Sequence, residues 1–193
     1  LDQLLKAQPG RVHEARGYEH WLRLLGSHTF TSSFAWFHHK FWEWYWPLAL
    51  QVQEGIEPDI NDLVCMLPWS RDTGKSSHTE WSAICEGALV HKGYVLWVSA
   101  KAQQAEEHVT SIRNRIESEK VAKYYPWLST PKVGSHGNKF GWGKEFLMTK
   151  GGWAVRPAGL DAYLRGGKIL DMRPSLIVVS DVDEIGDSPV VVQ

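Results

Sequence analysis

The sequence predicts an α/β fold, with a mostly parallel central sheet flanked by helices and preceded by a helical N-terminal segment. From residue 63 onward, short apolar runs bounded by turn residues alternate with longer amphipathic stretches. The apolar runs are continuous rather than alternating, which is typical of strands buried on both faces of a parallel sheet. Alternation of strands and helices favours the same architecture. With 193 residues, the chain is long enough for one sizeable core.

The chain divides into a Trp-rich helical segment, residues 1–55, and a core, residues 56–193, on which that segment packs. Aromatic residues between 34 and 46 recur at three- and four-residue steps, which predicts one stripe along a helix. Core packing is favoured for this stripe, although stacking on adenine or contact with a partner fits the same pattern. The stripe consists of Phe34, Phe37, Phe41 and Tyr45.

Within the core, strands are expected at 63–67, 94–100, 153–159 and 176–180. Helices are expected at 76–90 and 102–119, with short strands and loops at 120–150. The second helix has an apolar face made of Ala105, Val109, Ile112 and Ile116. Cys65 lies in the first strand and Cys85 in the first helix, so both are interpreted as reduced core residues.

Charge and composition exclude several classes of protein. The net charge is -1, from 21 basic and 22 acidic residues, so a whole-surface polyanion binder is excluded. No CxxC pair is present, which argues against a cysteine-based zinc site. No apolar run reaches the roughly 18–20 residues of a membrane span. Between 132 and 150, lysines alternate with aromatic residues, which fits either a DNA-backbone contact or a solvated hairpin; they are Lys132, Lys139, Lys144 and Lys150.

The strongest chemical motif is Gly74-Lys75-Ser76, between an expected strand and an expected helix. This placement directs backbone N–H groups and the positive end of the helix toward an anion. Lys75 would stand beside the terminal phosphates of ATP, and the Ser76 hydroxyl would ligate Mg²⁺. Trp69 occupies the position of the usual first glycine. The expected nucleotide-binding residues are Arg71, Asp72, Thr73, Gly74, Lys75, Ser76 and Ser77.

Acidic residues follow the last expected strand, at the sheet edge where open parallel sheets bind ligands. A P-loop ATPase needs one carboxylate for the metal ion and one to activate the attacking water. We favour Asp181 for the metal, with Asp183 or Glu184 for the water. The alternative makes Asp181 the water-activating group and weakens metal support. Ser180 stands where the metal aspartate is usual.

Four segments, in this order, resemble the large terminase subunits of tailed bacteriophages: SRDTGKSS, YVLWVSAKAQQAEEHV, AYLRGGK and RPSLIVVSDVDEIGDSP. The stretch FAWFHHKFWEW also resembles the helix before the phosphate loop in that family. The resemblance covers roughly residues 34–190. It implies a RecA-like P-loop (ASCE) ATPase that drives double-stranded DNA into a capsid.

The resemblance also implies site residues and partners. Arg71 matches the arginine within the family's phosphate loop, and Arg165 matches an arginine that can act as a finger on a neighbouring subunit. A plain loop cation is the competing interpretation of Arg165. The implied cofactors are ATP and Mg²⁺, and the implied partners are double-stranded DNA, the portal protein, the small terminase subunit and further copies in a ring. The expected location is the host cell cytoplasm.

Two other functions fit the same residues. One is another P-loop ATPase, helicase-like or RecA-like. The other is a degenerate terminase-like domain that binds a nucleotide or partner without hydrolysis, for which Ser180 is the argument. Relatives continue into a coupling motif and a nuclease, whereas this sequence ends at Gln193, so no nuclease activity is expected of it.

Overall fold

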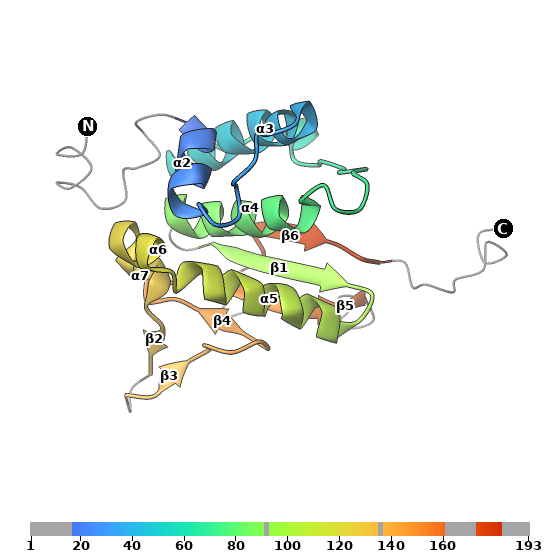
Figure 1. Ribbon diagram of the computed structural model, residues 1–193. Helices are drawn as coiled ribbons and strands as arrows, with labels where there is room; N and C mark the ends of the chain where they lie inside the picture. The colour runs from blue at the N-terminus through green and yellow to red at the C-terminus, as the bar shows by residue number, and fades with distance from the viewer. Residues whose placement is uncertain (1–16, 91–92, 135–136, 161–172, 183–193) are drawn as a thin grey trace, which may run out of the picture.

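The computed structural model describes residues 17–90, 93–134, 137–160 and 173–182. Its main sheet has four strands in the order β4-β5-β1-β6 (Figure 1). The central strand β1 pairs in parallel with β5 and with β6, whereas β4 runs antiparallel to β5. The α/β class and the mostly parallel sheet are therefore confirmed. The strands are β1 (Tyr94–Ser99), β4 (Leu147–Met148), β5 (Ala154–Gly159) and β6 (Leu176–Val179).

Helices flank this sheet in layers. Helix α4 follows the candidate phosphate loop, residues 70–74, and α5 follows β1; α2 and α3 lie beyond α4, away from the sheet (Figure 1). No helix in the described part of the chain combines the length and apolarity needed to cross a membrane. The helices are α2 (Gly17–Leu25), α3 (Trp36–Gln53), the 3₁₀ turn η2 (Ile60–Asp62), α4 (Lys75–Leu89), α5 (Ala102–Ile116), α6 (Glu119–Tyr124) and α7 (Pro126–Ser129).

Tryptophans form much of the core between the sheet and the helices. Five of them are exposed by no more than 2%: Trp21, Trp42, Trp81, Trp97 and Trp153. The α5 face predicted from the sequence is buried completely, at Ala105, Val109, Ile112 and Ile116. Core packing is therefore the main role of the indoles, although Trp36 is 75% exposed at the start of α3.

The aromatic stripe forms part of a longer helix than the sequence indicates. Helix α3 continues through Pro47, which lacks the N–H for one helical hydrogen bond. Phe41 and Tyr45 are buried as predicted and their rings stack, whereas Phe34 precedes the helix. Burial of the following turn explains why the helix persists beyond Pro47, because Ala49 also lies in the core.

The prediction of a buried strand at 63–67 is wrong. This stretch has no strand pairing and is mostly exposed, with Val64 at 80% and Met66 at 86%. A strand needs a neighbour for its backbone N–H and C=O groups, and an apolar run does not provide one by itself. The expectation that Cys65 is a core residue fails for the same reason, whereas Cys85 is buried as expected.

The last strand is only half buried, contrary to the expected fully buried strand at 176–180. Leu176 and Val178 pack against the core, but Ile177 is 45% exposed and Val179 is 59% exposed. The reason is position: among the described residues β6 pairs only with β1, so it lies at an edge of the sheet.

The lysine-rich region contains the expected short strands. Strands β2 (Lys132–Val133) and β3 (Lys139–Phe140) form an antiparallel pair, with Phe140 and Lys139 exposed. Lys144 forms an ion pair with Glu106 of α5 at 2.8 Å. This arrangement is an exposed hairpin.

Candidate phosphate-binding site

The Gly74-Lys75-Ser76 motif lies at the first turn of α4. Gly74 is the N-cap residue, with a left-handed backbone (φ 80°, ψ 13°), and it has no side chain to cap the helix. The first N–H groups of an α-helix lack partners within the helix, so they need partners from elsewhere. A glycine adopts this backbone without strain, which explains the residue type. A glycine at the start of a helix is the backbone arrangement that anion sites use, and the anion site expected here stays a prediction.

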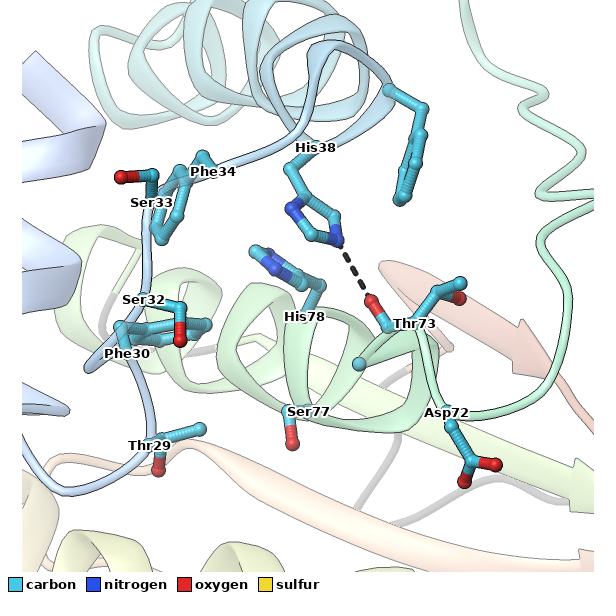
Figure 2. A pocket seen from close by; sticks show the side chains of 12 residues that line it. Thr29, Phe30, Ser32, Ser33, Phe34, His38, Asp72, Thr73, Ser77 and His78 are labelled. Atoms are coloured by element: carbon cyan, nitrogen blue, oxygen red, sulfur yellow. Dashed lines mark hydrogen bonds between the residues drawn. The ribbon is translucent and has the colours of Figure 1, made fainter.

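His38 of α3 is hydrogen-bonded to the backbone of the candidate phosphate loop. Its Nδ1 accepts a hydrogen bond from the Ala35 backbone N–H (3.0 Å), so its proton is on Nε2. That Nε2–H donates to the Thr73 backbone oxygen at 2.7 Å (Figure 2). The bond holds the backbone directly before Gly74 against α3.

Trp69 fastens the same loop through ring contacts. Its indole lies 5.0 Å from the Phe37 ring and 5.1 Å from the His38 ring, between centroids. It also lies 6.0 Å from Phe41. Packing on the aromatic stripe accounts for a large residue at a position where P-loops usually have glycine.

A pocket of about 320 Å³ opens beside the loop. One wall comes from the 29–38 segment and the other from the loop and the start of α4 (Figure 2). Aromatic rings, hydroxyls and loop backbone face the same space, which suits a flat ligand with polar edges. The lining includes Thr29, Phe30, Ser32, Phe34, His38, Thr73, Gly74 and His78.

His78 lies at the inner end of this pocket and is uncharged. The Trp42 indole N–H donates to its Nδ1 at 2.9 Å, so Nε2 carries the proton of the neutral ring. Its ring stacks on that of His38, with centroids 4.2 Å apart. Burial and the neighbouring His38 lower the pKa of His78 from 6.5 to about 3. The pocket thus has a neutral, hydrogen-bonding floor at physiological pH.

Soon after strand β6, the chain has a residue with an unusual backbone conformation. Asp181 has a left-handed conformation (φ 50°), which is uncommon outside glycine and asparagine-like residues. Its backbone oxygen accepts a hydrogen bond from Ala100 N–H at 3.1 Å. The Asp181 side chain is 57% exposed. The carboxylate therefore projects from the sheet edge while its backbone is held to the end of β1.

Ser180 has a structural partner. Its hydroxyl accepts a hydrogen bond from the Trp97 indole N–H at 2.9 Å and lies 3.3 Å from the Ser99 hydroxyl. The Ser180 side chain thus satisfies a buried indole N–H.

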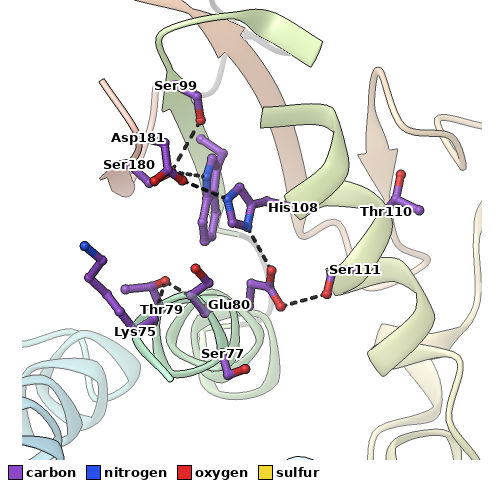
Figure 3. Close-up of polar contacts among 12 residues, drawn as sticks. Lys75, Ser77, Thr79, Glu80, Ser99, His108, Thr110, Ser111, Ser180 and Asp181 are labelled. Carbon is purple, nitrogen blue, oxygen red and sulfur yellow. Dashed lines mark hydrogen bonds and ion pairs between the residues drawn. The ribbon is translucent and has the colours of Figure 1, made fainter. Parts of the chain in front are cut away.

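The phosphate loop and the acidic strand end lie at the same edge of the sheet. Helix α4 begins where the arrowheads of β1 and β6 point (Figure 1). One imidazole joins the two sides: His108 Nδ1 lies 2.8 Å from Glu80 of α4, and its Nε2 lies 3.6 Å from Asp181 (Figure 3). Burial lowers the pKa of His108, but Glu80 and Asp181 outweigh it and leave the pKa raised above 6.5.

Glu80 is the centre of a polar cluster that the sequence did not reveal. Its carboxylate, 5% exposed, also accepts hydrogen bonds from Ser111 Oγ (2.7 Å) and Arg115 Nε (2.9 Å). Arg115 in turn donates to Thr29 Oγ1 in the pocket wall at 2.6 Å. Glu80 on α4 and Arg115 on α5 are 35 positions apart, so no local spacing in the sequence predicts the pair. The available signal was that each helix carries a charged residue among its apolar ones.

The described site residues lie on the loop and at the start of α4. Arg71 and Asp72 are exposed on the loop, and Ser76 is exposed in the first turn of α4. Asp72 has a positive φ (62°) and also lines the pocket. Thr73, Gly74 and Ser77 line the pocket, and Lys75 is half-buried at the helix start. Arg165, Asp183 and Glu184 lie outside the described residues, so their predicted roles stay predictions.

The donors at this edge fit a magnesium ion that keeps most of its own water and phosphate ligands. Among the described residues, no three His, Cys, Asp or Glu side chains form a group able to hold a metal. The exposed Ser76 hydroxyl and the projecting Asp181 carboxylate are hard oxygen donors, and Mg²⁺ in nucleotide sites commonly takes one or two such protein ligands.

Comparisons with known proteins found no match to the chain among family models, curated proteins or solved structures.

Proposed function

We propose that this chain is the RecA-like ATPase motor domain of a viral DNA-packaging terminase. In this proposal it hydrolyses ATP in the host cell cytoplasm and drives double-stranded DNA into a capsid. One observation carries the ATPase part: the helix that starts at Gly74-Lys75-Ser76 begins at the sheet edge where Asp181 lies (Figure 1), and His108 contacts both Asp181 and Glu80 of that helix. The packaging part depends on the ordered resemblance of four sequence segments to the terminase family.

Each side chain then has a distinct role at the proposed site. Lys75 and the free N–H groups of α4 neutralise phosphate charge, and Arg71 adds a cation at the loop. Ser76 and Asp181 would hold Mg²⁺, which would supply charge neutralisation to the phosphates. We assign activation of the attacking water to Asp183 or Glu184, and the role of an arginine finger to Arg165.

The pocket beside the loop is proposed to hold the base of the nucleotide. Its volume of about 320 Å³ is within the range of small-molecule sites, and its walls combine aromatic rings and hydroxyls with one carboxylate, Asp72. A neutral His78 adds no charge that a base would have to desolvate, and the one carboxylate in the lining, Asp72, is exposed to solvent. The loop forms one wall, so phosphates at α4 and a base in the pocket belong to one ligand.

DNA and protein partners are proposed from the family resemblance. Lys132 and Lys139 are available on the hairpin for a phosphate backbone, whereas Lys144 is ion-paired with Glu106. The portal protein, the small terminase subunit and further copies in a ring complete the proposed assembly.

A second candidate is a nucleotide-binding domain that does not hydrolyse ATP. The observation that favours it is Ser180, whose hydroxyl bonds Trp97 where the family has an aspartate. Both candidates predict nucleotide binding at the loop, and only the first predicts turnover.

Nucleotide binding and turnover are tested with Lys75→Ala. Wild type should bind a fluorescent ATP analogue with Mg²⁺ and hydrolyse ATP, and Lys75→Ala should weaken binding at least about tenfold and abolish turnover, because a charge-assisted phosphate contact is removed. Lys120→Ala is the matched control, since Lys120 bonds only Ser27 on the exposed surface among described residues. Equal affinity of Lys75→Ala and wild type would refute the site; binding without turnover would select the second candidate.

A further inference from the structure

His108 stands between two carboxylates that come from different elements. Its Nδ1 lies 2.8 Å from Glu80 Oε1 on α4, and its Nε2 lies 3.6 Å from Asp181 Oδ2 after β6 (Figure 3). The ring itself belongs to α5. One imidazole thus connects the helix that begins with the phosphate loop to the acidic end of the last strand.

The contact on the Glu80 side is rigid. Glu80 is nearly buried and also accepts hydrogen bonds from Ser111 and Arg115, so both of its oxygens have donors. The Glu80 carboxylate oxygen is the acceptor of this hydrogen bond, so the His108 Nδ1–H is the donor. A buried, fully satisfied carboxylate cannot turn without losing several hydrogen bonds, so it fixes this edge of the imidazole.

The plane of the imidazole is fixed from another direction. The Trp97 indole stacks on it, with centroids 4.6 Å apart and planes 26° apart. Trp97 is fully buried, and its N–H is bonded to Ser180. With one edge on Glu80 and one face on Trp97, the ring has a single orientation, in which Nε2 faces Asp181.

Asp181 has little else to orient it. Its side chain is 57% exposed, and in the described part of the chain the group within ion-pair distance of it is His108 Nε2, at 3.6 Å. Its left-handed backbone sets where the side chain leaves the strand end, but the backbone alone does not select one rotamer of an exposed carboxylate. The imidazole therefore supplies the missing constraint.

We propose that His108 is a positioning residue: Glu80 and Trp97 hold its ring so that Nε2 directs the Asp181 carboxylate toward the ligand site at the start of α4. The inference depends on the proposed function, because it assigns Asp181 to the magnesium ion of a bound nucleotide. It adds to that function a residue that orients the Asp181 carboxylate. Ser180 is not available for this role, because its hydroxyl is hydrogen-bonded to the Trp97 indole. Partners of this kind, one step behind a metal ligand, typically change metal affinity by about 10–100-fold when replaced.

Two amide substitutions at His108 distinguish the roles of its two ring nitrogens. The amide nitrogen of Asn reaches the position of Nδ1, so His108→Asn keeps a donor for Glu80 and loses the group that faces Asp181. The amide of Gln reaches the position of Nε2, so His108→Gln keeps a polar group toward Asp181. The measurement is the affinity for a non-hydrolysable ATP analogue with and without Mg²⁺, and the quantity compared is the gain in affinity that Mg²⁺ produces.

His108→Asn should reduce the magnesium-dependent gain about tenfold or more and leave magnesium-free binding unchanged. His108→Gln should restore at least part of the gain, which a merely structural role would not predict. His20→Asn on α2, distant from the site in sequence and fold, is the control and should match wild type. Unfolding midpoints are recorded for all variants, so that a loss of folded protein is not read as a loss of magnesium binding.

Asp181→Asn gives a second route to the same answer, because it leaves the Glu80 contacts in place. It should lose the same gain, and the double variant with His108→Asn should lose no more than either single variant. A full gain in His108→Asn or in Asp181→Asn overturns the positioning role while nucleotide binding by wild type keeps the proposed function. Absence of nucleotide binding by wild type overturns both.

Discussion

Glu86 of α4 gives the sharpest stability prediction, because it is a buried carboxyl with few partners. It is 5% exposed, and the Trp153 indole N–H donates to Oε2 at 3.2 Å. Burial raises the pKa of Glu86 from 4.5 to about 7, against hydrogen bonds from Ser175 and Trp153 that lower it. The substitution Glu86→Gln removes the ionisation and keeps an oxygen that can accept from Trp153.

The magnitude follows from the two pKa values. Below pH about 4, Glu86 is protonated in both the folded and the unfolded chain, so ionisation contributes nothing. Between pH 4.5 and 7 the unfolded chain ionises first, so the free energy of unfolding falls as pH rises through the folded pKa. With 1.36 kcal/mol for each pKa unit, the loss is about 3 kcal/mol.

The assay is urea unfolding of both proteins at several pH values from 4 to 8. Glu86→Gln should match wild type in stability at pH 4 and exceed it by about 3 kcal/mol at pH 8, because the variant lacks the buried charge. The control is Glu107→Gln, an exposed position on α5, which should show no such trend. A difference between Glu86→Gln and wild type that is constant over this range would refute the reasoning.

Two further predictions test the packing of α4 against Trp153 and the exposure of the 63–67 segment. Gly87→Ala should destabilise the protein by about 1–2 kcal/mol in urea unfolding, because the added Cβ would lie 2.6 Å from Trp153 Cδ2 and overpacking of about 1–3 kcal/mol outweighs the helix preference for alanine. The control Gly143→Ala, whose added Cβ would have nothing within 4 Å, should leave stability unchanged. Equal stability of the two variants would contradict the close packing at Gly87. Native protein should react with Ellman's reagent at Cys65 and spare Cys85; Cys65→Ser should abolish that reaction, and a second reactive thiol would contradict the buried position of Cys85.

Elements whose evidence is local were predictable from the sequence. The apolar face of α5 follows from helical spacing alone, and all four of its residues are buried. Strand β1 is apolar at nearly every position and lies at the centre of the sheet, where both faces are covered. Gly74 marks the start of α4 because its left-handed backbone favours glycine. In each case the physical cause lies within a few residues of its effect.

Features that depend on a distant partner were not predictable. The 63–67 run has the composition of a strand, but strand formation is decided by a hydrogen-bonding neighbour, and none pairs with it among the described residues. The edge position of β6 likewise depends on which strands surround it, so its half-exposed pattern could not be inferred from its apolar residues. Trp69 looked like a departure from the motif, whereas its cause is the packing of the loop on Phe37 and His38.

The same reasoning explains how the candidate site can tolerate Ser180. A strand-end aspartate at that position would place a carboxylate next to the buried Trp97 N–H and the Ser99 hydroxyl, whereas serine satisfies the indole without a charge. The next residue, Asp181, then provides the exposed carboxylate, and its left-handed backbone turns the chain at that point. The exposed Asp181 side chain has His108 in contact with it. In the proposed site, Ser180, Asp181 and the imidazole held by Glu80 are therefore parts of one arrangement at this edge of the sheet.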